Sequence, residues 1–322
     1  MRQFPALVFA ALAAMALPAL ADPPASRQPL IDMHLHVVGV TPSGGFEWYD
    51  PVPPNPFTGK PTGKLTSSDA LMAELFGELG RYRLVKAMVS STPPNVARAA
   101  KAYPNLVIKG VFLGPEAPYN IPPKVLREDI LAGRLQVLGE LAPQYFGMPL
   151  TAPVFEQYYA LAEEMDVPIG IHTGLASAPN EVVAAGLRTK YRGDYGNPAG
   201  LEEVLNRHPN LRLYLMHAGH PYFAETYGIL QAYPTVYADL AYINYYLPRE
   251  EFHRYLKLLI KAIPGVDKRL MFGTDAYLWK EAIKPSIEAI ETADFLTAEQ
   301  KADIFCNNAA RFLRLDPATC KP

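Results

Sequence analysis

Six residues with metal-binding side chains stand at the ends of short apolar segments of the sequence. Residues 30–36 read LIDMHLH and end in two histidines, His34 and His36. Side chains two positions apart point to the same face of a β-strand, so both imidazoles can be directed at one point. Later segments of the same kind end in Glu140, His172, His217 and Asp275. Imidazole and carboxylate ligands suit zinc and related divalent ions, so these residues predict a metal centre.

Eight such apolar segments alternate with helical patterns, which predicts an α/β fold of the (β/α)8 TIM-barrel type. The expected strands are 30–36, 84–90, 106–112, 135–141, 167–172, 211–217, 235–240 and 269–275. A doubly wound open sheet is the alternative, but no glycine-rich turn follows the first strand. In a barrel, the carboxyl ends of all strands face one mouth, where the six residues would meet.

The first 21 residues have the pattern of a secretory signal peptide. A basic residue, Arg2, precedes an apolar stretch at 4–17, and small residues at 19 and 21 mark a cleavage site. We expect cleavage after Ala21, which leaves a single barrel domain at 22–322 in the periplasm or secreted. A transmembrane anchor is the alternative, but the apolar stretch is short and prolines interrupt both of its ends.

Composition narrows the class of partner. The chain has 322 residues, 49% of them apolar, and a formal net charge of −2 with both signs interspersed. Such a chain can bury one large core, and it carries no basic region for nucleic acid or a membrane surface. We therefore expect a small-molecule substrate and no membrane anchor. The composition does not decide whether the protein forms a homo-oligomer.

Two cysteines, Cys306 and Cys320, are the only ones in the sequence. Export would place them in an oxidising compartment, where they can pair and hold the C-terminal segment. The alternative is one buried and one exposed thiol, and spacing alone does not decide between the two.

Several motifs resemble the amidohydrolase superfamily: the His-x-His pair, HTG at 172–174, HAGHP at 217–221 and FGTD at 272–275. Residues 197–221 and CNNAARFLRL at 306–315 are similar to the amidohydrolase-related branch that includes aminocarboxymuconate-semialdehyde decarboxylase. The resemblance implies a distorted barrel that holds one or two divalent ions. The ligand types favour zinc, with manganese as the alternative. The implied ligands are His34, His36, His172 and Asp275.

The resemblance gives alternatives for His217 and Glu140, and the chemistry of a carboxylate beside a metal ion gives a role for Asp275. His217 is either a ligand of a second metal ion or a catalytic acid/base. Glu140 is either a further metal ligand or a carboxylate that orients a histidine. Asp275, besides binding metal, is the expected catalytic proton acceptor from metal-activated water.

Three residues are candidates for substrate binding. Trp48 lies in a long connection, 37–65, with six prolines after the first strand, where a lid or binding loop is expected. Arg192 could meet a substrate carboxylate, with a solvated loop as the alternative. His220 lies beyond the sixth strand, and a turn-stabilising role is its alternative. Asp239, which ends the seventh strand, lines the mouth or plays a structural part.

The leading functional hypothesis is an exported, metal-dependent hydrolase that cleaves an amide, ester or lactone of a small molecule. A metal-dependent, non-oxidative decarboxylase of an unsaturated or aromatic acid would use the same ligands. A periplasmic ligand-binding protein without catalytic activity is the third hypothesis, although a complete ligand set argues against it.

Overall fold

The computed structural model describes residues 28–174 and 190–321, so the predicted signal peptide lies outside the described residues. Eight parallel strands follow one another in chain order around a nearly closed barrel, which confirms the predicted fold. They are β1 (Leu30–His36), β2 (Leu84–Ser90), β3 (Val107–Leu113), β4 (Val137–Leu141), β5 (Ile169–His172), β6 (Leu213–Met216), β7 (Tyr237–Asp239) and β8 (Leu270–Met271).

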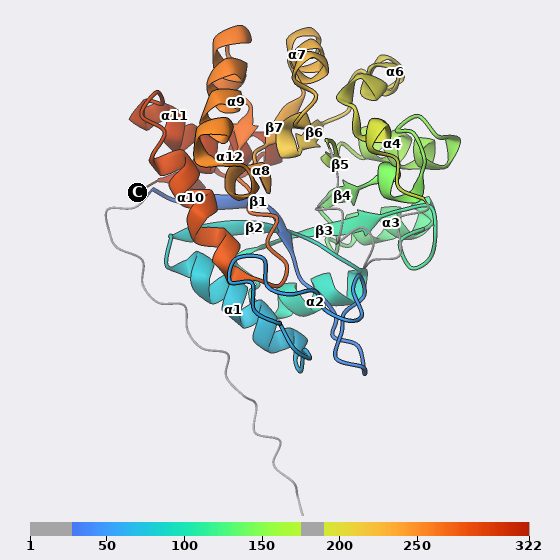
Figure 1. The fold of residues 1–322 in the computed structure, drawn as a ribbon. Coiled ribbons are helices and arrows are strands. Elements are labelled where there is room, and N and C mark those ends of the chain that lie inside the picture. The colour runs from blue at the N-terminus through green and yellow to red at the C-terminus, as the bar shows by residue number, and fades with distance from the viewer. Residues whose placement is uncertain (1–27, 175–189, 322) are drawn as a thin grey trace, which may run out of the picture.

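Helices surround these strands on the outside (Figure 1). The longer ones are α1 (Ser68–Gly80), α2 (Pro93–Ala102), α3 (Pro123–Leu131), α4 (Pro153–Glu164), α6 (Leu201–Arg207), α7 (Phe223–Ala232), α9 (Arg249–Ala262) and α10 (Ile283–Glu291), and the shorter ones are α8 (Ile243–Tyr246), α11 (Ala298–Ala302) and α12 (Asn308–Leu313). Local sequence explains their starts. Ser67 accepts a hydrogen bond from the Ala70 N–H at the start of α1, and prolines open α2, α3 and α4. None of the described helices is long and apolar enough to cross a bilayer.

The eighth strand is shorter than the predicted range 269–275, because irregular backbone replaces its second half. The barrel still closes there: the Met33 N–H donates to Phe272 O at 3.0 Å, and the Asp275 N–H donates to His34 O. Asp32 reinforces this seam, since its carboxylate accepts from the Thr274 hydroxyl at 2.6 Å and from the Thr274 N–H. The closure therefore fixes Asp275 directly beside the ligand pair of β1.

Apolar packing fills the amino-terminal end of the barrel. Ile31, Met33 and Met271 point inward and pack with Phe312 of α12, and all four are buried. A larger cluster lies between the strands and the outer helices. Because one end of the barrel is filled with side chains, the other end is left to hold polar residues.

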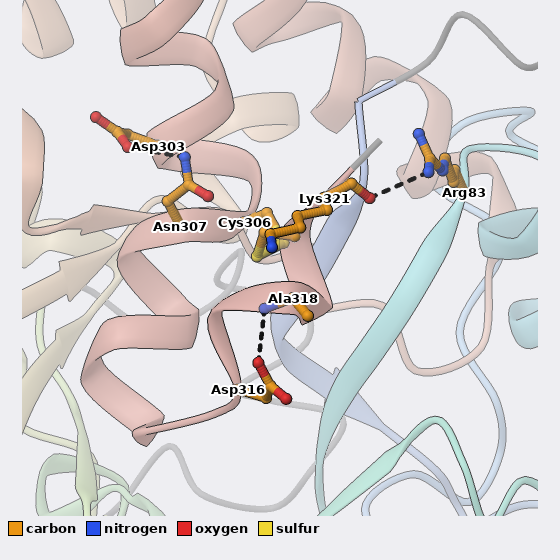
Figure 2. Close-up of a disulfide and its surroundings, with 8 residues drawn as sticks. Arg83, Asp303, Cys306, Asn307, Asp316, Ala318 and Lys321 are labelled. Carbon is orange, nitrogen blue, oxygen red and sulfur yellow. Dashed lines mark hydrogen bonds between the residues drawn. A yellow bond between two sulfur atoms is a disulfide. The ribbon is translucent and has the colours of Figure 1, made fainter.

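A disulfide joins Cys306 to Cys320, so pairing is the outcome of the two alternatives that the sequence left open. Figure 2 shows the bond between the π-helical segment that precedes α12 and the C-terminal segment. Nearby, the Arg83 guanidinium donates to Lys321 O at 3.3 Å. The disulfide thus keeps the C-terminal segment next to the apolar residues that fill the amino-terminal end of the barrel.

Replacing Cys320 should lower stability without changing the site at the opposite end of the barrel. The bond joins two residues 14 positions apart, and a closed loop of about this length is worth about 3 kcal/mol when it constrains the unfolded chain. Denaturant unfolding should show a Cys320→Ser protein that is less stable by about 2–3 kcal/mol. In reductant, the wild-type protein should lose the same amount of stability, and the Cys320→Ser protein should lose none. A wild-type protein whose stability does not change in reductant would contradict the disulfide.

Candidate metal centre

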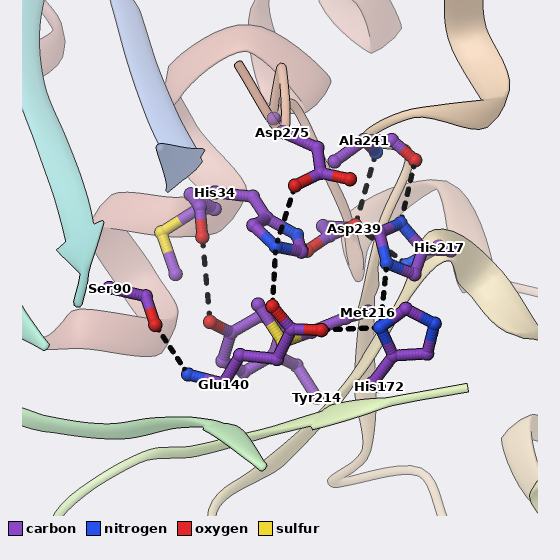
Figure 3. A network of polar contacts seen from close by, with 12 residues as sticks. His34, Ser90, Glu140, His172, Tyr214, Met216, His217, Asp239, Ala241 and Asp275 are labelled. Carbon is purple, nitrogen blue, oxygen red and sulfur yellow. Dashed lines mark hydrogen bonds and ion pairs between the residues drawn. The ribbon is translucent and has the colours of Figure 1, made fainter. Parts of the chain in front are cut away.

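The predicted ligands meet at the carboxyl-terminal mouth of the barrel. His34 and His36 lie at the end of β1, Glu140 in β4 and His172 at the end of β5. His217 follows β6 directly, and Asp275 lies in the irregular segment four residues beyond the end of β8. All except Asp275 are buried, and the Asp275 side chain is 17% exposed. Figure 3 shows Glu140 and Asp275 reaching the histidines from opposite sides.

Two carboxylates bridge the histidine pair of β1. Glu140 Oε2 lies 3.4 Å from Nε2 of both His34 and His36. Asp275 Oδ1 lies 3.4 Å from His34 Nε2 and 3.0 Å from His36 Nε2. The other oxygen of Glu140 contacts His172 Nδ1, which is 3.3 Å from His217 Nε2. Four imidazoles and two carboxylates therefore surround one small volume.

Three of the histidines are oriented by acceptors outside this volume. His34 Nδ1 contacts Asp239 Oδ2 at 3.1 Å. His36 Nδ1 contacts Ser90 O at 2.8 Å, and His217 Nδ1 contacts Ala241 O at 3.0 Å. A carbonyl oxygen only accepts, so His36 and His217 carry a proton on Nδ1 and direct Nε2 inward. Metal-binding histidines are commonly held in this way.

The residues present fit a divalent ion. His34 Nε2 is fully buried and forms no hydrogen bond of good geometry, although a Glu140 and an Asp275 oxygen each lie 3.4 Å from it. Donor atoms that face one another without bonding suit an ion held between them. Ligand atoms within 4.8 Å of one another occur in three overlapping groups: His34, His36 and Glu140; His34, His217 and Asp275; and Glu140, His172 and His217. Nitrogen and oxygen donors at this density are typical of zinc and manganese sites.

Charge within the cluster also favours a cation. Burial lowers the pKa of His36, but Asp275 and Glu140 raise it to about 9. Burial raises the pKa of Glu140, but the His172 imidazole together with His34 and His36 holds it well below its usual range. Burial and the neighbouring His172 lower the pKa of His217 to about 4. The carboxylates are thus ionised, and a bound metal ion would replace protons on the imidazoles.

Backbone strain is concentrated at this mouth. His217, Ala218, Tyr242 and Asp275 have φ of 63°, 45°, 64° and 55°, in the left-handed region that residues other than glycine rarely adopt. Such strain persists where surrounding contacts over-determine the conformation, and it clusters at functional sites. Here it turns the side chains of His217 and Asp275 towards the ligand pair.

A cavity of about 200 Å³ opens above the cluster. Its described lining residues are His36, Glu47, Trp48, Tyr49, Phe112, Tyr119, Glu140, Tyr145, Phe146, His172, Asp275 and Tyr277. Trp48, predicted from the sequence to bind substrate, stands edge-on to His36 with ring centroids 5.1 Å apart. The long connection after β1 therefore forms part of the wall of the site.

The other two candidates for substrate binding lie outside this described wall. Arg192 is exposed, and its guanidinium donates to the carbonyl oxygen of Tyr191 at 2.9 Å. His220 is half-buried against the Tyr255 ring, with centroids 5.1 Å apart, and burial lowers its pKa. Their roles in substrate binding stay predictions.

Several wall residues were not singled out from the sequence. Tyr145, Tyr277 and Glu47 come from three different loops, so no spacing along the chain connects them. The available signal is weak: each lies within about a dozen residues of a strand end that carries a metal-binding residue. Asp239, left open between two roles, contacts His34 and also accepts from the His217 N–H at 2.8 Å.

A barrel with histidines and carboxylates at its mouth defines a class of metal-dependent enzymes. A family model described as amidohydrolase matches residues 31–315, and the chain belongs to this family. The resemblance noted in the sequence is therefore confirmed: the protein is an enzyme of the amidohydrolase superfamily, and a divalent metal is supported by the family and by the cluster.

Individual relatives are distant. The protein fluG of Emericella nidulans is 24% identical over 165 residues, which are 46% of this chain and 18% of the fungal protein. A probable 2-pyrone-4,6-dicarboxylic acid hydrolase of Acinetobacter baumannii has a TM-score of 0.61 at 13% identity, covering 89% of this chain and 99% of its own. The 5-carboxyvanillate decarboxylase of Novosphingobium aromaticivorans, solved with manganese, scores 0.62 at 13% identity, covering 91% and 98%. At such identities the two structures show a shared fold.

Proposed function

We propose that the protein is a hydrolase that cleaves an amide, ester or lactone bond of a small molecule. The observation that carries this proposal is Asp275, whose carboxylate lies beside His34 and His36 and is the part of the cluster most open to the cavity. Burial alone would raise its pKa, but His34 and His36 keep it below its usual value, so the group is ionised. It is thus able to accept a proton from water at the substrate.

The chain's own residues divide the remaining tasks. When bound by these ligands, a divalent ion would supply Lewis acidity that polarises a carbonyl group and makes water more acidic. Zinc is the ion we propose first, with manganese as the alternative. Asp275 takes the proton from the attacking water and returns it to the leaving group. His36 and His217 stay oriented because Ser90 O and Ala241 O hold their outer nitrogens.

Tyr145 is placed to donate a hydrogen bond to the substrate. Its ring stands edge-on to His172, with centroids 5.1 Å apart, and it lines the cavity. Burial and the neighbouring Glu140 raise the pKa of its hydroxyl well above the ordinary value, so the proton is retained. The structure gives this hydroxyl no hydrogen bond to a described residue, which leaves the donor for the substrate oxygen.

Tyr145→Phe should therefore lower kcat/KM about tenfold to a hundredfold, since each factor of ten is about 1.4 kcal/mol of lost transition-state binding. Metal content and melting temperature should be unchanged. Tyr233→Phe, at a hydroxyl that bonds Asn206 outside the cavity, is the matched control. Equal kinetics for both variants would remove Tyr145 from the mechanism.

A product assay distinguishes hydrolysis from decarboxylation, the alternative suggested by the fold shared with a decarboxylase. The metal-loaded protein is incubated with panels of aryl esters, amides, lactones and aromatic carboxylic acids. Hydrolysis releases an acid and incorporates oxygen from labelled water, whereas decarboxylation releases carbon dioxide and takes up a proton. Carbon dioxide from the acids, with no turnover of esters, amides or lactones, would reverse the assignment.

Export to the periplasm or the medium belongs to the same proposal. The N-terminal sequence pattern supports it, and so does a disulfide of the kind that persists in oxidising compartments. Mass spectrometry of the exported protein should find an N-terminus near Asp22. Retention of Met1 in the exported fraction would contradict it.

A further inference from the structure

The outer part of the cavity is walled by aromatic side chains, which we call the aromatic subsite: Trp48, Phe112, Tyr119 and Tyr277. Ring centroids are 5.8 Å apart for Trp48 and Phe112, 5.0 Å for Phe112 and Tyr119, and 5.9 Å for Trp48 and Tyr277. The indole N–H of Trp48 donates to Tyr119 Oη at 3.0 Å, which fixes the two rings relative to each other. Such rings offer faces and edges to a planar ligand.

This aromatic subsite begins at the metal centre. Trp48 is in edge contact with His36, so a substrate whose reacting bond lies at the metal ligands extends directly onto the rings. Segments from three parts of the barrel contribute, namely the loop after β1, the end of β3 with its loop, and the loop after β8. A preformed wall of this kind is typical of a ligand pocket that fixes one part of its substrate.

Glu47 adds a negative charge to the same wall. Its carboxylate accepts from the Gly39 N–H at 2.5 Å and from the Asn95 side chain at 2.5 Å, so its position is held by neutral groups. No described cation forms an ion pair with it. Besides burial, which is the larger effect, the charge of Glu47 raises the pKa of Tyr119. The charge therefore acts on the aromatic subsite itself.

Charge in the cavity is arranged unevenly. Among the described lining residues, the charged side chains other than histidines are the carboxylates of Glu47, Glu140 and Asp275. Glu140 and Asp275 face the metal centre, where a divalent ion would balance them. Glu47 has no such compensation from the residues that the structure describes, so a substrate carboxylate placed among the rings would meet like charge, whereas a cation would gain from both the rings and Glu47.

We propose that the aromatic subsite binds an uncharged or positively charged aromatic group of the substrate and that Glu47 excludes a negatively charged one. This proposal rests on the proposed function, and with it the expected substrates are esters, amides or lactones that carry such an aromatic group. Aromatic di- and tricarboxylates are excluded as substrates.

Hydroxamic acids, which chelate divalent ions, test the aromatic subsite by binding alone. Calorimetry with the metal-loaded protein should give benzohydroxamic acid an affinity at least about tenfold above that of acetohydroxamic acid, because the ring is buried. The 4-carboxy derivative should bind at least about tenfold more weakly than the parent, and the 4-trimethylammonio derivative at least as well. Equal or tighter binding of the 4-carboxy derivative would overturn the proposal.

Variants assign the discrimination to Glu47. Glu47→Gln should bring the affinities of the parent and the 4-carboxy probe within about threefold of each other, whereas Glu47→Asp, which keeps the charge, should preserve the difference. Melting temperatures show whether each variant is folded. An unchanged discrimination in folded Glu47→Gln would remove Glu47 from the proposal.

A second probe separates this proposal from the proposed function. In metal-free protein carrying Trp279→Phe, Trp48 is the remaining tryptophan of the two in the sequence. Benzyltrimethylammonium should quench its fluorescence and phenylacetate should not. Adding Glu47→Gln should weaken the quenching, which separates the charge of Glu47 from the charges of Glu140 and Asp275 in the metal-free site. Quenching in a protein that hydrolyses nothing would contradict the hydrolase and leave the aromatic subsite standing, whereas preference for phenylacetate would overturn the aromatic subsite whatever the reaction.

Discussion

The Asp275→Asn protein should fold and hold metal but lose about 10²–10⁴-fold in kcat, the usual cost of removing a general base. Asparagine keeps the shape of the side chain and the oxygen that lies 3.0 Å from His36 Nε2. It cannot take up a proton at neutral pH, so the step assigned to Asp275 fails while the geometry survives. The main-chain bond from the Asp275 N–H to His34 O is unaffected.

Three measurements on the Asp275→Asn protein belong together: kcat, metal content and melting temperature. Asp294→Asn, an exposed aspartate, is the matched control and should behave as wild type. A purely structural carboxylate would give a less stable protein with near-normal turnover per folded molecule. Normal kcat at full metal occupancy would exclude Asp275 from the chemistry.

The His34→Ala protein should lose metal before it loses its fold. His34 contacts both bridging carboxylates, and second-sphere changes alone typically weaken metal binding about 10–100-fold, so loss of a ligand should cost at least about a hundredfold. Removal also leaves Asp239 without its imidazole partner in a fully buried place. Asp239 Oδ1 keeps its bonds from the His217 and Ala241 N–H groups, but Oδ2 loses its partner, and we expect this to cost about 1–3 kcal/mol in the free energy of unfolding.

The control for this prediction is His253→Ala in α9, where the imidazole bonds Ala289 O and belongs neither to the metal-binding groups nor to the described cavity wall. It should retain metal and activity. Competition with a chromogenic chelator gives the metal affinity of each protein. An His34→Ala protein that binds metal as tightly as wild type would place the ion elsewhere.

The barrel and its ligand positions were accessible from the sequence because both depend on local patterns. Apolar runs ending in His34, His36, His172 or Asp275 mark strands whose carboxyl ends must share one mouth. The early end of β8 could not be predicted from the sequence, because contacts with β1, which is distant in sequence, shape the residues that follow Met271. For the same reason, the pairing of Asp239 with His34 could be only one of two alternatives.

The wall of the cavity was the least predictable part. Trp48 was recognised because it lies in a long, proline-rich connection after a ligand-bearing strand. Tyr145 and Glu47 reach the cavity through loop conformations that residue types do not specify. Arg192, chosen as a partner for a substrate carboxylate, is exposed and lies outside the described wall. Glu47, which lines the cavity, is therefore a better indicator of the preferred substrate charge than Arg192, which does not.

Elemental analysis of protein purified without chelator tests the metal centre most directly. The account predicts one or two equivalents of a divalent ion, zinc or manganese, per chain, removed by chelation together with activity and restored with it when the ion is returned. A chain that carries no divalent metal, and in which added ions neither bind nor support any turnover, would contradict it.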